Sequence, residues 1–360
     1  MGMQLGLGLY RRMLTPEYVR FAKQVGATHI VAHLPGEFVR DDAIITSDQA
    51  NVGFGVAASH DPIWTFEGLR DLKAMINAEG LELLALENFA PQHWYDVLLD
   101  GPKRQEQLDH LKQIIRTMGR VGIPIMGYNF SIAGVWGRIE GPFARGGAIS
   151  VGYENPDQPP IPHGMVWNMV YDPERYDPSG ANGTVAPVSL EALWTRYTAF
   201  LDELLPVAEE AGVTLALHPD DPPLPTLRGT ARLVHTPDGY GRVLDYHPSP
   251  RHAMEFCIGT LSEMPDGNIY QMVDRYSRTG RIGYIHFRNV RGTVPTYHET
   301  FIDEGDTDML EVLRILHQNN YNGVLIPDHT PLVECAAPWH AGMAYALGYM
   351  KAAIALVERT

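Results

Sequence analysis

The sequence predicts a single-domain (β/α)8 TIM barrel over residues 1–360, with a long insertion after the fourth strand. Eight short apolar runs alternate with stretches of helical periodicity along the chain. The runs are almost continuously apolar, as strands of a parallel sheet are when both of their faces are buried. Polar side chains that can bind a metal end the last four runs, and the active sites of such barrels lie where the strands end.

The eight runs predict the barrel strands in chain order. Eight strand–helix units favour a closed barrel over an open sheet. The main alternative is a doubly wound fold, but the first run carries only Gly6 and Gly8 of a GxGxxG motif, with Arg11 at the position of the third glycine. The expected strands are residues 5–10, 29–34, 81–89, 123–130, 213–218, 252–257, 282–290 and 323–328.

Two of the expected helices have clear end signals. Thr15 precedes Pro16, which is an N-cap followed by proline in the first turn, and Gly26 follows the last periodic residue. The segment 189–212 begins with serine, ends with glycine and contains a proline. Both segments therefore predict helices between neighbouring strands.

Composition excludes two classes of partner. The formal net charge is -15, from 28 basic and 43 acidic residues, so no positive surplus is available to neutralise phosphates and nucleic acid is not expected. No apolar run approaches the roughly 20 residues that a membrane-spanning helix needs. The chain has 2 cysteines, and its first residues lack a basic region and a cleavage site, which favours a cytoplasmic protein without a disulfide framework.

One long interruption follows the fourth expected strand. Residues 131–188 are rich in glycine and proline and show little helical periodicity. A loop of this length inside a compact domain is usually functional or disordered. Trp136 and Trp167 argue against complete disorder, because disordered tracts contain few aromatic residues. Loops after barrel strands lie on the active-site face, so we expect a lid or substrate clamp, with a plain surface insertion as the alternative.

A candidate metal site comes from the ends of the last four runs. The residues there are spaced 39, 29 and 42 positions apart, about the length of one strand–helix unit, so a barrel would bring them to one rim. A lone histidine or buried cysteine is more often structural, but imidazole, thiolate and carboxylate at equivalent places favour a divalent metal. Zinc would suit four such ligands, whereas a site with open positions favours manganese or iron. The four candidates are His218, Cys257, His286 and Asp328.

Further polar residues near these ligands suit a substrate rich in oxygen. Two carboxylates, Asp220 and Asp221, lie just past a strand end. Arg288 is two residues after His286 and therefore shares its strand face, where a guanidinium can bind a carboxylate through two hydrogen bonds. His298 and Glu299 could act as acid and base, or could belong to a solvated loop.

Several short motifs occur in a fixed order from about residue 120 onward. They are Tyr128-Asn-Phe, Trp136-Gly-Arg, His218-Pro-Asp-Asp-Pro-Pro, Phe256-Cys-Ile-Gly, His286-Phe-Arg-Asn-Val, His298-Glu, Gly305-Asp-Thr-Asp-Met and Pro327-Asp-His. Together they resemble the successive motifs of mannonate dehydratase, a family of metal-dependent barrel enzymes of hexuronate breakdown. The order of several motifs is far more specific than any one of them.

This resemblance implies a dehydratase that removes water from a sugar acid such as D-mannonate and leaves a 2-keto-3-deoxy sugar acid. It implies Mn2+ or Fe2+ as cofactor, held by the four candidate ligands, and a proton-transfer role for His329. The residues expected to contact the substrate are Arg288, Asn129, Trp136, Arg138 and Asp220.

The chain departs from the family pattern at three places. Thr330-Pro331 stands where the family has Gly-Arg, Met343 falls at a family tyrosine, and Val135 replaces an acidic residue. These changes leave the metal ligands intact but alter groups that would touch substrate or move protons. Tyr345 or His298 is therefore the expected second proton-transfer group.

Two other functions stay open from the sequence. A metal-dependent isomerase, epimerase or other β-eliminating enzyme acting on a sugar or glycoside would use the same barrel and metal. A carbohydrate-binding protein that has lost catalysis would keep the ligands without turnover. Barrels of this kind often associate, so a homo-oligomer is also an open expectation.

Overall fold

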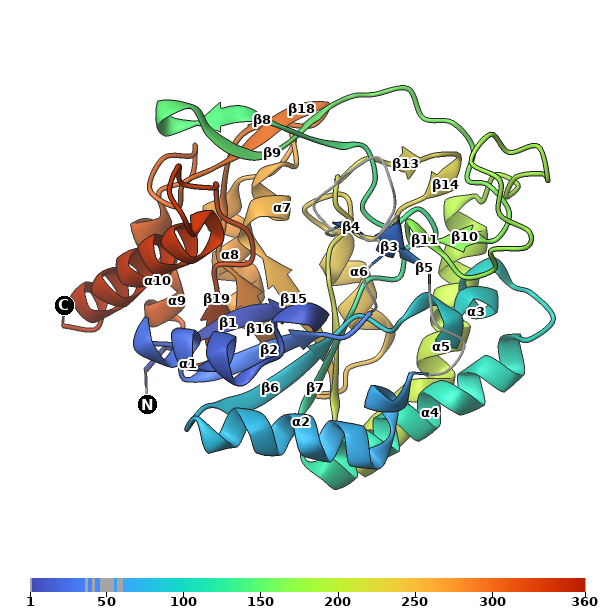
Figure 1. Ribbon diagram of the computed structural model, residues 1–360, viewed down its shortest axis with the longest axis horizontal. Helices are drawn as coiled ribbons and strands as arrows, with labels where there is room; N and C mark the ends of the chain where they lie inside the picture. The colour runs from blue at the N-terminus through green and yellow to red at the C-terminus, as the bar shows by residue number, and fades with distance from the viewer. Residues whose placement is uncertain (1, 36–37, 41–42, 46–54, 57–60, 360) are drawn as a thin grey trace.

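Eight parallel strands close into a barrel, and each strand pairs with a neighbour on both sides (Figure 1). The computed structural model describes residues 2–35, 38–40, 43–45, 55–56 and 61–359. The predicted barrel is confirmed and the doubly wound alternative is excluded, because the first strand pairs with both the second and the last. In barrel order the strands are β1 (Gln4–Tyr10), β19 (Val324–Ile326), β16 (Ile282–His286), β15 (His252–Cys257), β12 (Thr214–Leu217), β7 (Ile125–Tyr128), β6 (Glu82–Glu87) and β2 (His29–His33).

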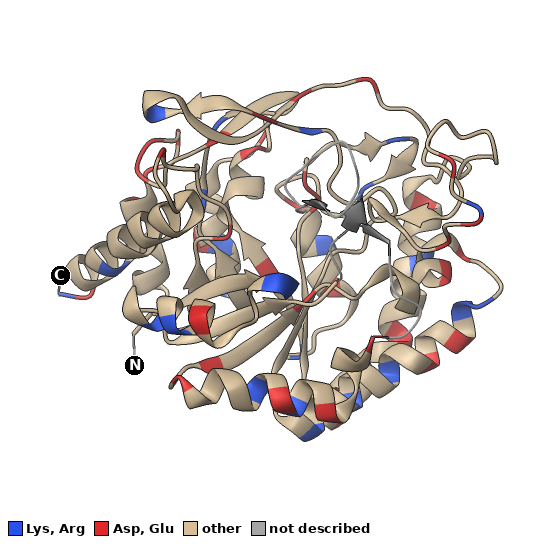
Figure 2. Cartoon of the chain, in the orientation of Figure 1, with Lys and Arg blue, Asp and Glu red and all other residues tan. Residues whose placement is uncertain are grey.

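Helices surround the barrel and bury one apolar face against it. Figure 2 shows basic and acidic residues interspersed along the helices labelled α2 and α4 in Figure 1, as expected for helices with a solvated face. Within the described residues, no helix has both the length and the apolar character that crossing a membrane requires. The helices are α1 (Pro16–Gln24), α2 (Phe66–Ala78), α3 (Tyr95–Leu99), α4 (Arg104–Val121), α5 (Leu190–Ala211), α6 (Gly239–Tyr246), α7 (Ile258–Ser262), α8 (Ile269–Ser277), α9 (Met309–Gln318) and α10 (Pro338–Val357), with 3-10 turns η1 (Arg11–Met13), η2 (Pro62–Trp64), η3 (Pro91–His93) and η4 (Arg145–Gly147).

The helix predicted over 189–212 forms as α5, and its ends show why. The Ser189 side chain accepts a hydrogen bond from the backbone N–H of Ala192, which satisfies one of the free donors of the first turn. Gly212 ends the helix with a φ of 70°, a left-handed conformation that glycine adopts without a side-chain clash. The helix predicted after Thr15 also forms, although the Thr15 side chain makes no capping hydrogen bond.

The 131–188 segment contains regular structure that its composition did not reveal. Its hairpin of β8 (Arg138–Ala144) and β9 (Ala148–Glu154) pairs with the hairpin of β17 (Asn289–Thr293) and β18 (Thr296–Thr300), in the order β17-β18-β9-β8. Figure 1 places this four-stranded sheet at the end of the barrel that also carries α7. The short strands outside the barrel and this sheet are β3 (Phe38–Arg40), β4 (Ala43–Ile45), β5 (Gly55–Val56), β10 (Met165–Val166), β11 (Met169–Val170), β13 (Thr226–Leu227) and β14 (Thr230–Ala231).

The barrel interior has an apolar layer and a polar one. The apolar layer is a small buried cluster on the barrel strands, which includes Val31, Ala85, Ala216 and Ile326. Toward the carboxyl ends of the same strands, the side chains change to histidine, glutamate, cysteine and aspartate. This change places polar groups on the face where barrel enzymes carry their active sites.

Candidate metal centre and active site

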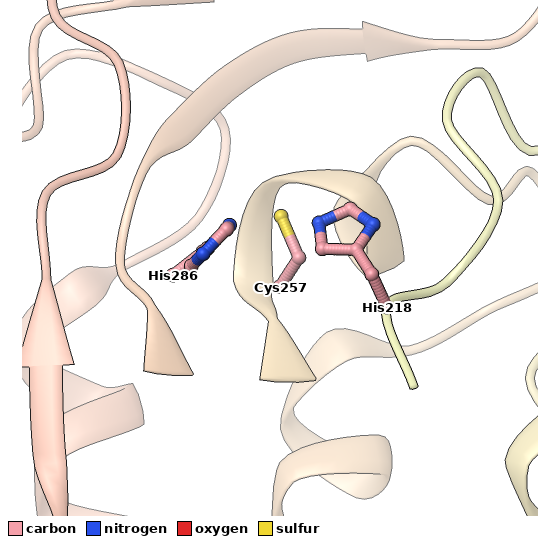
Figure 3. A group of neighbouring side chains, drawn as sticks. All are labelled: His218, Cys257 and His286. Carbon is pink, nitrogen blue, oxygen red and sulfur yellow. The ribbon is translucent and has the colours of Figure 1, made fainter. Parts of the chain in front are cut away.

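Three of the four candidate ligands meet where strands β12, β15 and β16 end. His218, Cys257 and His286 each offer one ligand atom, and these atoms all lie within 4.8 Å of one another (Figure 3). Asp328, two residues after β19, brings Oδ2 to 3.3 Å from Nδ1 of His286. Its backbone φ of 58° is in the left-handed region, which few residues other than glycine adopt, and such conformations concentrate at functional sites.

Cys257 lies at the N-terminus of α7 and is fully buried. Its Sγ accepts hydrogen bonds from the Thr260 backbone N–H at 3.4 Å and from the Thr260 hydroxyl at 3.2 Å. Burial raises the pKa of the thiol, but Arg288 and the two histidines outweigh burial and hold this pKa well below its usual value. Cys257 is therefore set up as a thiolate, which is the form that binds metals.

The ring nitrogens of the two histidines have different surroundings. The Nδ1–H of His218 donates to the carbonyl oxygen of Pro219 at 2.6 Å, so Nε2 is the nitrogen left for a metal. Among the described residues the buried Nδ1 of His286 makes no hydrogen bond, and it lies 3.3 Å from Oδ2 of Asp328. Two imidazoles with one nitrogen available, a thiolate and a carboxylate fit a borderline divalent cation such as zinc, manganese or iron.

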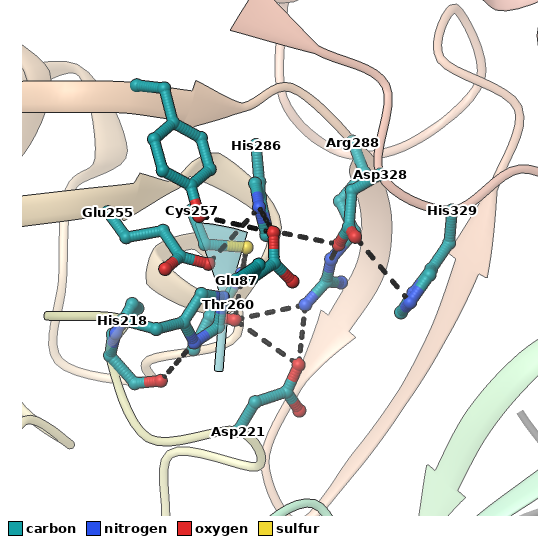
Figure 4. Close-up of polar contacts among 12 residues, drawn as sticks. Glu87, His218, Asp221, Glu255, Cys257, Thr260, His286, Arg288, Asp328 and His329 are labelled. Atoms are coloured by element: carbon teal, nitrogen blue, oxygen red, sulfur yellow. Dashed lines mark hydrogen bonds and ion pairs between the residues drawn. The ribbon is translucent and has the colours of Figure 1, made fainter. Parts of the chain in front are cut away.

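A half-buried glutamate, Glu87, and a buried one, Glu255, lie beside these ligands and were not predicted. Nε2 of His286 is 3.3 Å from Glu87 and 3.3 Å from Glu255, and the three residues form a second group that could hold a cation (Figure 4). Burial and the neighbouring Glu87 raise the pKa of Glu255 to about 8. Glu255 stands two residues before Cys257 in a strand, so the two share one face, and this spacing was a usable signal.

A cavity opens above these residues at the carboxyl ends of the strands. Six of the residues predicted for the site line this cavity: His218, His286, Asp328, His329, Asn129 and Arg138. Asp221, one of the two carboxylates expected past the fifth strand, also lines it. The remaining lining residues were not predicted for the site: Tyr10, His33, Glu87, Asn88, Val135, Trp167 and Glu255.

His329 faces this cavity and is held by a carboxylate. Its Nδ1 lies 3.0 Å and 3.1 Å from the two carboxylate oxygens of Glu299. Burial disfavours the charged ring, but Asp328 and Glu299 outweigh it and raise the pKa of His329 to about 9. His329 therefore carries a proton at neutral pH.

Two arginines converge on Asp221, yet only one of them lines the cavity. Nη2 of Arg138 and Nη2 of Arg288 each donate to Oδ2 of Asp221 at 2.7 Å. Arg288 also donates to Glu263 at 2.8 Å and to Thr260 at 3.0 Å, so both of its Nη atoms are engaged within the protein. Its side chain passes over the glycine of the Phe-Cys-Ile-Gly motif, where a Cβ would lie 2.5 Å from Nη1. Arg288 thus stabilises the buried residues next to Cys257, whereas Arg138 faces the cavity.

Asp220 and Trp136 make structural contacts outside the cavity lining. The Asp220 carboxylate accepts from the backbone N–H groups of Leu233 and Val234 at 2.8 Å each, which fixes the loop after β12. Trp136 packs under the guanidinium of Arg228, whose carbon lies 5.0 Å from the ring centre. Neither residue is brought to the substrate space.

His298 and Tyr345 also lie away from the cavity. Residues of β18 alternate between its two faces, so Tyr297 and Glu299 are buried while His298 points outward, stacks on Phe143 and contacts Glu154 at 3.0 Å. Tyr345 is 42% exposed on α10, and its hydroxyl accepts from Arg145 at 3.3 Å. The structure does not bring either group to the metal ligands.

Comparison with known proteins decides the family. The model of the D-mannonate dehydratase (UxuA) family matches residues 23–177 and 179–353. This chain belongs to that family. The resemblance predicted from the motifs is confirmed, and so is the enzyme class, a hydro-lyase.

Relatives of the mannonate dehydratase family align with most of the chain. The enzyme of Streptococcus pneumoniae is 30% identical over 276 residues, which cover 74% of this chain and 74% of the relative. The enzyme of Thermotoga maritima is 28% identical over 324 residues, covering 81% and 86%. The crystal structure of mannonate dehydratase from Streptococcus suis has a TM-score of 0.77 at 24% identity and covers 99% of this chain and 94% of that one. A xylose isomerase domain protein from Planctomyces limnophilus, with a TM-score of 0.58 at 12% identity and full coverage of both chains, shares the fold.

Proposed function

We propose that this protein removes water from a sugar acid such as D-mannonate and produces a 2-keto-3-deoxy sugar acid. The observation that carries the proposal is that three of the four candidate metal ligands, His218, His286 and Asp328, line one cavity together with a carboxylate-held histidine, while Cys257 lies within 4.8 Å of the two ligand histidines. The family membership supports the reaction class, and the relatives named mannonate dehydratase suggest the substrate.

In this proposal Mn2+ or Fe2+ is held by four ligands: His218, Cys257, His286 and Asp328. When bound, such a cation acts as a Lewis acid that makes the carbon-bound proton next to the substrate carboxylate more acidic. The thiolate and carboxylate supply the negative charge that a cation needs, and each histidine supplies a neutral nitrogen.

Arg138 takes the role of binding the substrate carboxylate, in place of Arg288. Its side chain is 6% exposed and lines the cavity, and Asp221 holds only one of its Nη atoms at hydrogen-bond distance. A guanidinium can present two parallel donors to a carboxylate. Asn129 also lines the cavity, and its buried Oδ1 has no hydrogen-bond partner among the residues that the structure describes, so this oxygen is suited to accept from a sugar hydroxyl.

Two histidines divide the proton transfers. His329, which is protonated at neutral pH, donates a proton to the departing hydroxyl and releases it as water. His33 removes the carbon-bound proton, and its Nδ1 lies 3.9 Å from Oε1 of Glu87, which orients the ring. The electron pair of the broken C–H bond forms the C=C bond of an enol as the C–O bond breaks, and the enol becomes the 2-keto product.

A different substrate is the second candidate, and one observation favours it. Thr330 and Met343, two positions where the chain departs from the family motifs, line a smaller pocket together with His329. An isomerase, epimerase or other β-eliminating enzyme for a sugar or glycoside would use the same metal and the same histidine.

Incubation with a panel of aldonic acids and neutral sugars tests the proposal. The protein is first treated with a chelator and then assayed with and without manganese. A metal-dependent 2-keto-3-deoxy product supports the dehydratase, and interconversion of sugars supports the alternative. Binding without turnover of any compound contradicts both.

A further inference from the structure

We infer that Glu87 and Glu255 are positioning residues that fix the metal-binding tautomer of His286. This inference rests on the metal site proposed above and extends it to a layer of residues beneath the ligands. Neither glutamate belongs to the four candidate ligands, and both act through the histidine.

The two ring nitrogens of His286 face different partners. Nδ1 is 3.3 Å from Oδ2 of Asp328, on the side of the metal ligands. Nε2 is 3.3 Å from Oε2 of Glu87 and 3.3 Å from Oε1 of Glu255 (Figure 4). The Tyr284 hydroxyl donates to the same Glu87 oxygen at 3.2 Å and helps to hold that carboxylate in place.

The barrel makes room for this layer at a single glycine. Gly127 lies on β7, and a Cβ at this position would be 2.3 Å from Glu255 Oε2 and 2.3 Å from the Tyr284 hydroxyl oxygen. Glu255 is 1% exposed and Tyr284 is fully buried. An alanine at 127 would therefore push both side chains away from the histidine.

A carboxylate on Nε2 has a direct effect on Nδ1. The ionised Glu87 keeps the proton on Nε2, leaves the lone pair on Nδ1 and makes that nitrogen a stronger ligand, and Glu255, 3.3 Å from the same nitrogen, acts in the same way when it is ionised. Loss of such a partner typically weakens metal binding about 10- to 100-fold. The competing interpretation is that the two glutamates and Nε2 themselves hold a second cation, since their ligand atoms lie within 4.8 Å of one another.

Metal titration distinguishes these interpretations. Chelator-treated wild type, Glu87→Gln and Glu255→Gln are titrated with Mn2+ in equilibrium dialysis, and with Co2+, whose visible absorption reports the ligand geometry. Glu82→Gln is the matched control, because it makes the same change on the same strand with a side chain that is 81% exposed. We expect one equivalent in every protein, about 10- to 100-fold weaker binding and an altered cobalt spectrum in the two variants, and wild-type behaviour in the control.

Tyr284→Phe provides a second variant that preserves the volume of the side chain. It removes the hydroxyl that contacts Glu87 and Glu255 and leaves both carboxyl groups in place, so its affinity should fall between those of wild type and Glu87→Gln, and it decides the question if a glutamine variant does not fold. Two equivalents in wild type, with one lost in the glutamine variants, would overturn the inference in favour of a second cation site. If Glu87→Gln, Glu255→Gln and Tyr284→Phe all keep the affinity and the cobalt spectrum of wild type, the positioning role is wrong but the metal site stands. If wild type itself binds no metal, the proposed metal site is wrong as well.

Discussion

The imidazole of His329 is held by both carboxylate oxygens of Glu299, at 3.0 Å and 3.1 Å from Nδ1. Glu299 lies on β18 of the four-stranded sheet, and His329 lies in the loop after the barrel strand β19. The sheet that the insertion completes therefore reaches into the candidate active site, and it sets the orientation of the proposed acid.

Replacement of His329 by asparagine should lower kcat by about 10²- to 10⁴-fold, the usual contribution of a general acid or base. The metal ligands are unchanged, so the metal content of the variant should equal that of wild type. Steady-state kinetics and elemental analysis check these two outcomes. Unchanged turnover of the true substrate would exclude His329 from proton transfer.

Replacement of Glu299 by glutamine should shift the alkaline limb of the pH–rate profile to lower pH. Asp328 and Glu299 raise the pKa of His329 to about 9 against burial, so removing one carboxylate lowers it. Activity that needs the protonated ring is present below this pKa and is lost as the pH rises through it. A profile of kcat against pH for both proteins measures the shift, and superimposable profiles would contradict the prediction.

The sequence allowed prediction of the barrel and of the ligand positions for one physical reason. Strands buried on both faces appear as continuous apolar runs, so a polar residue at the end of a run is visible without knowledge of the fold. His218, Cys257 and His286 were found in this way. Glu255 was missed because it lies within such a run and was treated as part of the strand.

The functional roles were harder to predict, because they depend on contacts between distant segments. Arg138 and Asp221 are 83 positions apart, and their contact cannot be inferred from the spacing of either motif. The choice between His298 and Glu299 depends on which face of β18 is covered. The orientation of β18 follows from its place in the sheet that it forms with β9, and β9 lies in an insertion whose composition suggested only a loop.

His33 and His298 provide a matched pair for the proposed base. His33→Asn should lower kcat by about 10²-fold or more, because its ring lines the cavity beside Glu87. His298→Asn should leave kcat within about twofold, since that ring lies outside the cavity lining and makes a contact with Glu154, an exposed carboxylate at the outer end of β9. Parallel kinetic measurements on the two variants check the assignment, and the reverse ranking would refute it.

Arg138→Lys should reduce kcat/KM for the sugar acid about 10- to 100-fold, mainly through KM. A lysine keeps the charge but cannot present two parallel donors, and a hydrogen bond to a charged group contributes about 1.5–3 kcal/mol. Arg288→Lys should instead weaken metal binding, because Arg288 lowers the pKa of the Cys257 thiol. Michaelis–Menten kinetics and metal titration of both variants separate the two roles. If only Arg288→Lys changes KM, Arg288 and not Arg138 binds the substrate carboxylate.

Stability should fall between pH 6.5 and pH 4, in part through His252. This ring is fully buried, and burial lowers its pKa to about 4 although its hydrogen bond to the His247 carbonyl opposes the shift. Its Nε2 accepts from the Tyr197 hydroxyl at 3.0 Å, so the folded state keeps the ring neutral. The unfolded chain binds a proton below about pH 6.5, which favours unfolding by up to about 3 kcal/mol once the pH reaches 4.

His252→Gln should remove this pH dependence while lowering stability at neutral pH. Below pH 6.5 the free energy of unfolding of wild type should therefore fall more steeply than that of the variant. His93, whose pKa burial lowers to about 3, titrates in both proteins, so its contribution cancels in the difference. Urea denaturation across this pH range measures both slopes. Equal slopes would mean that His252 is accessible to protons in the folded state, in conflict with its burial against Tyr197.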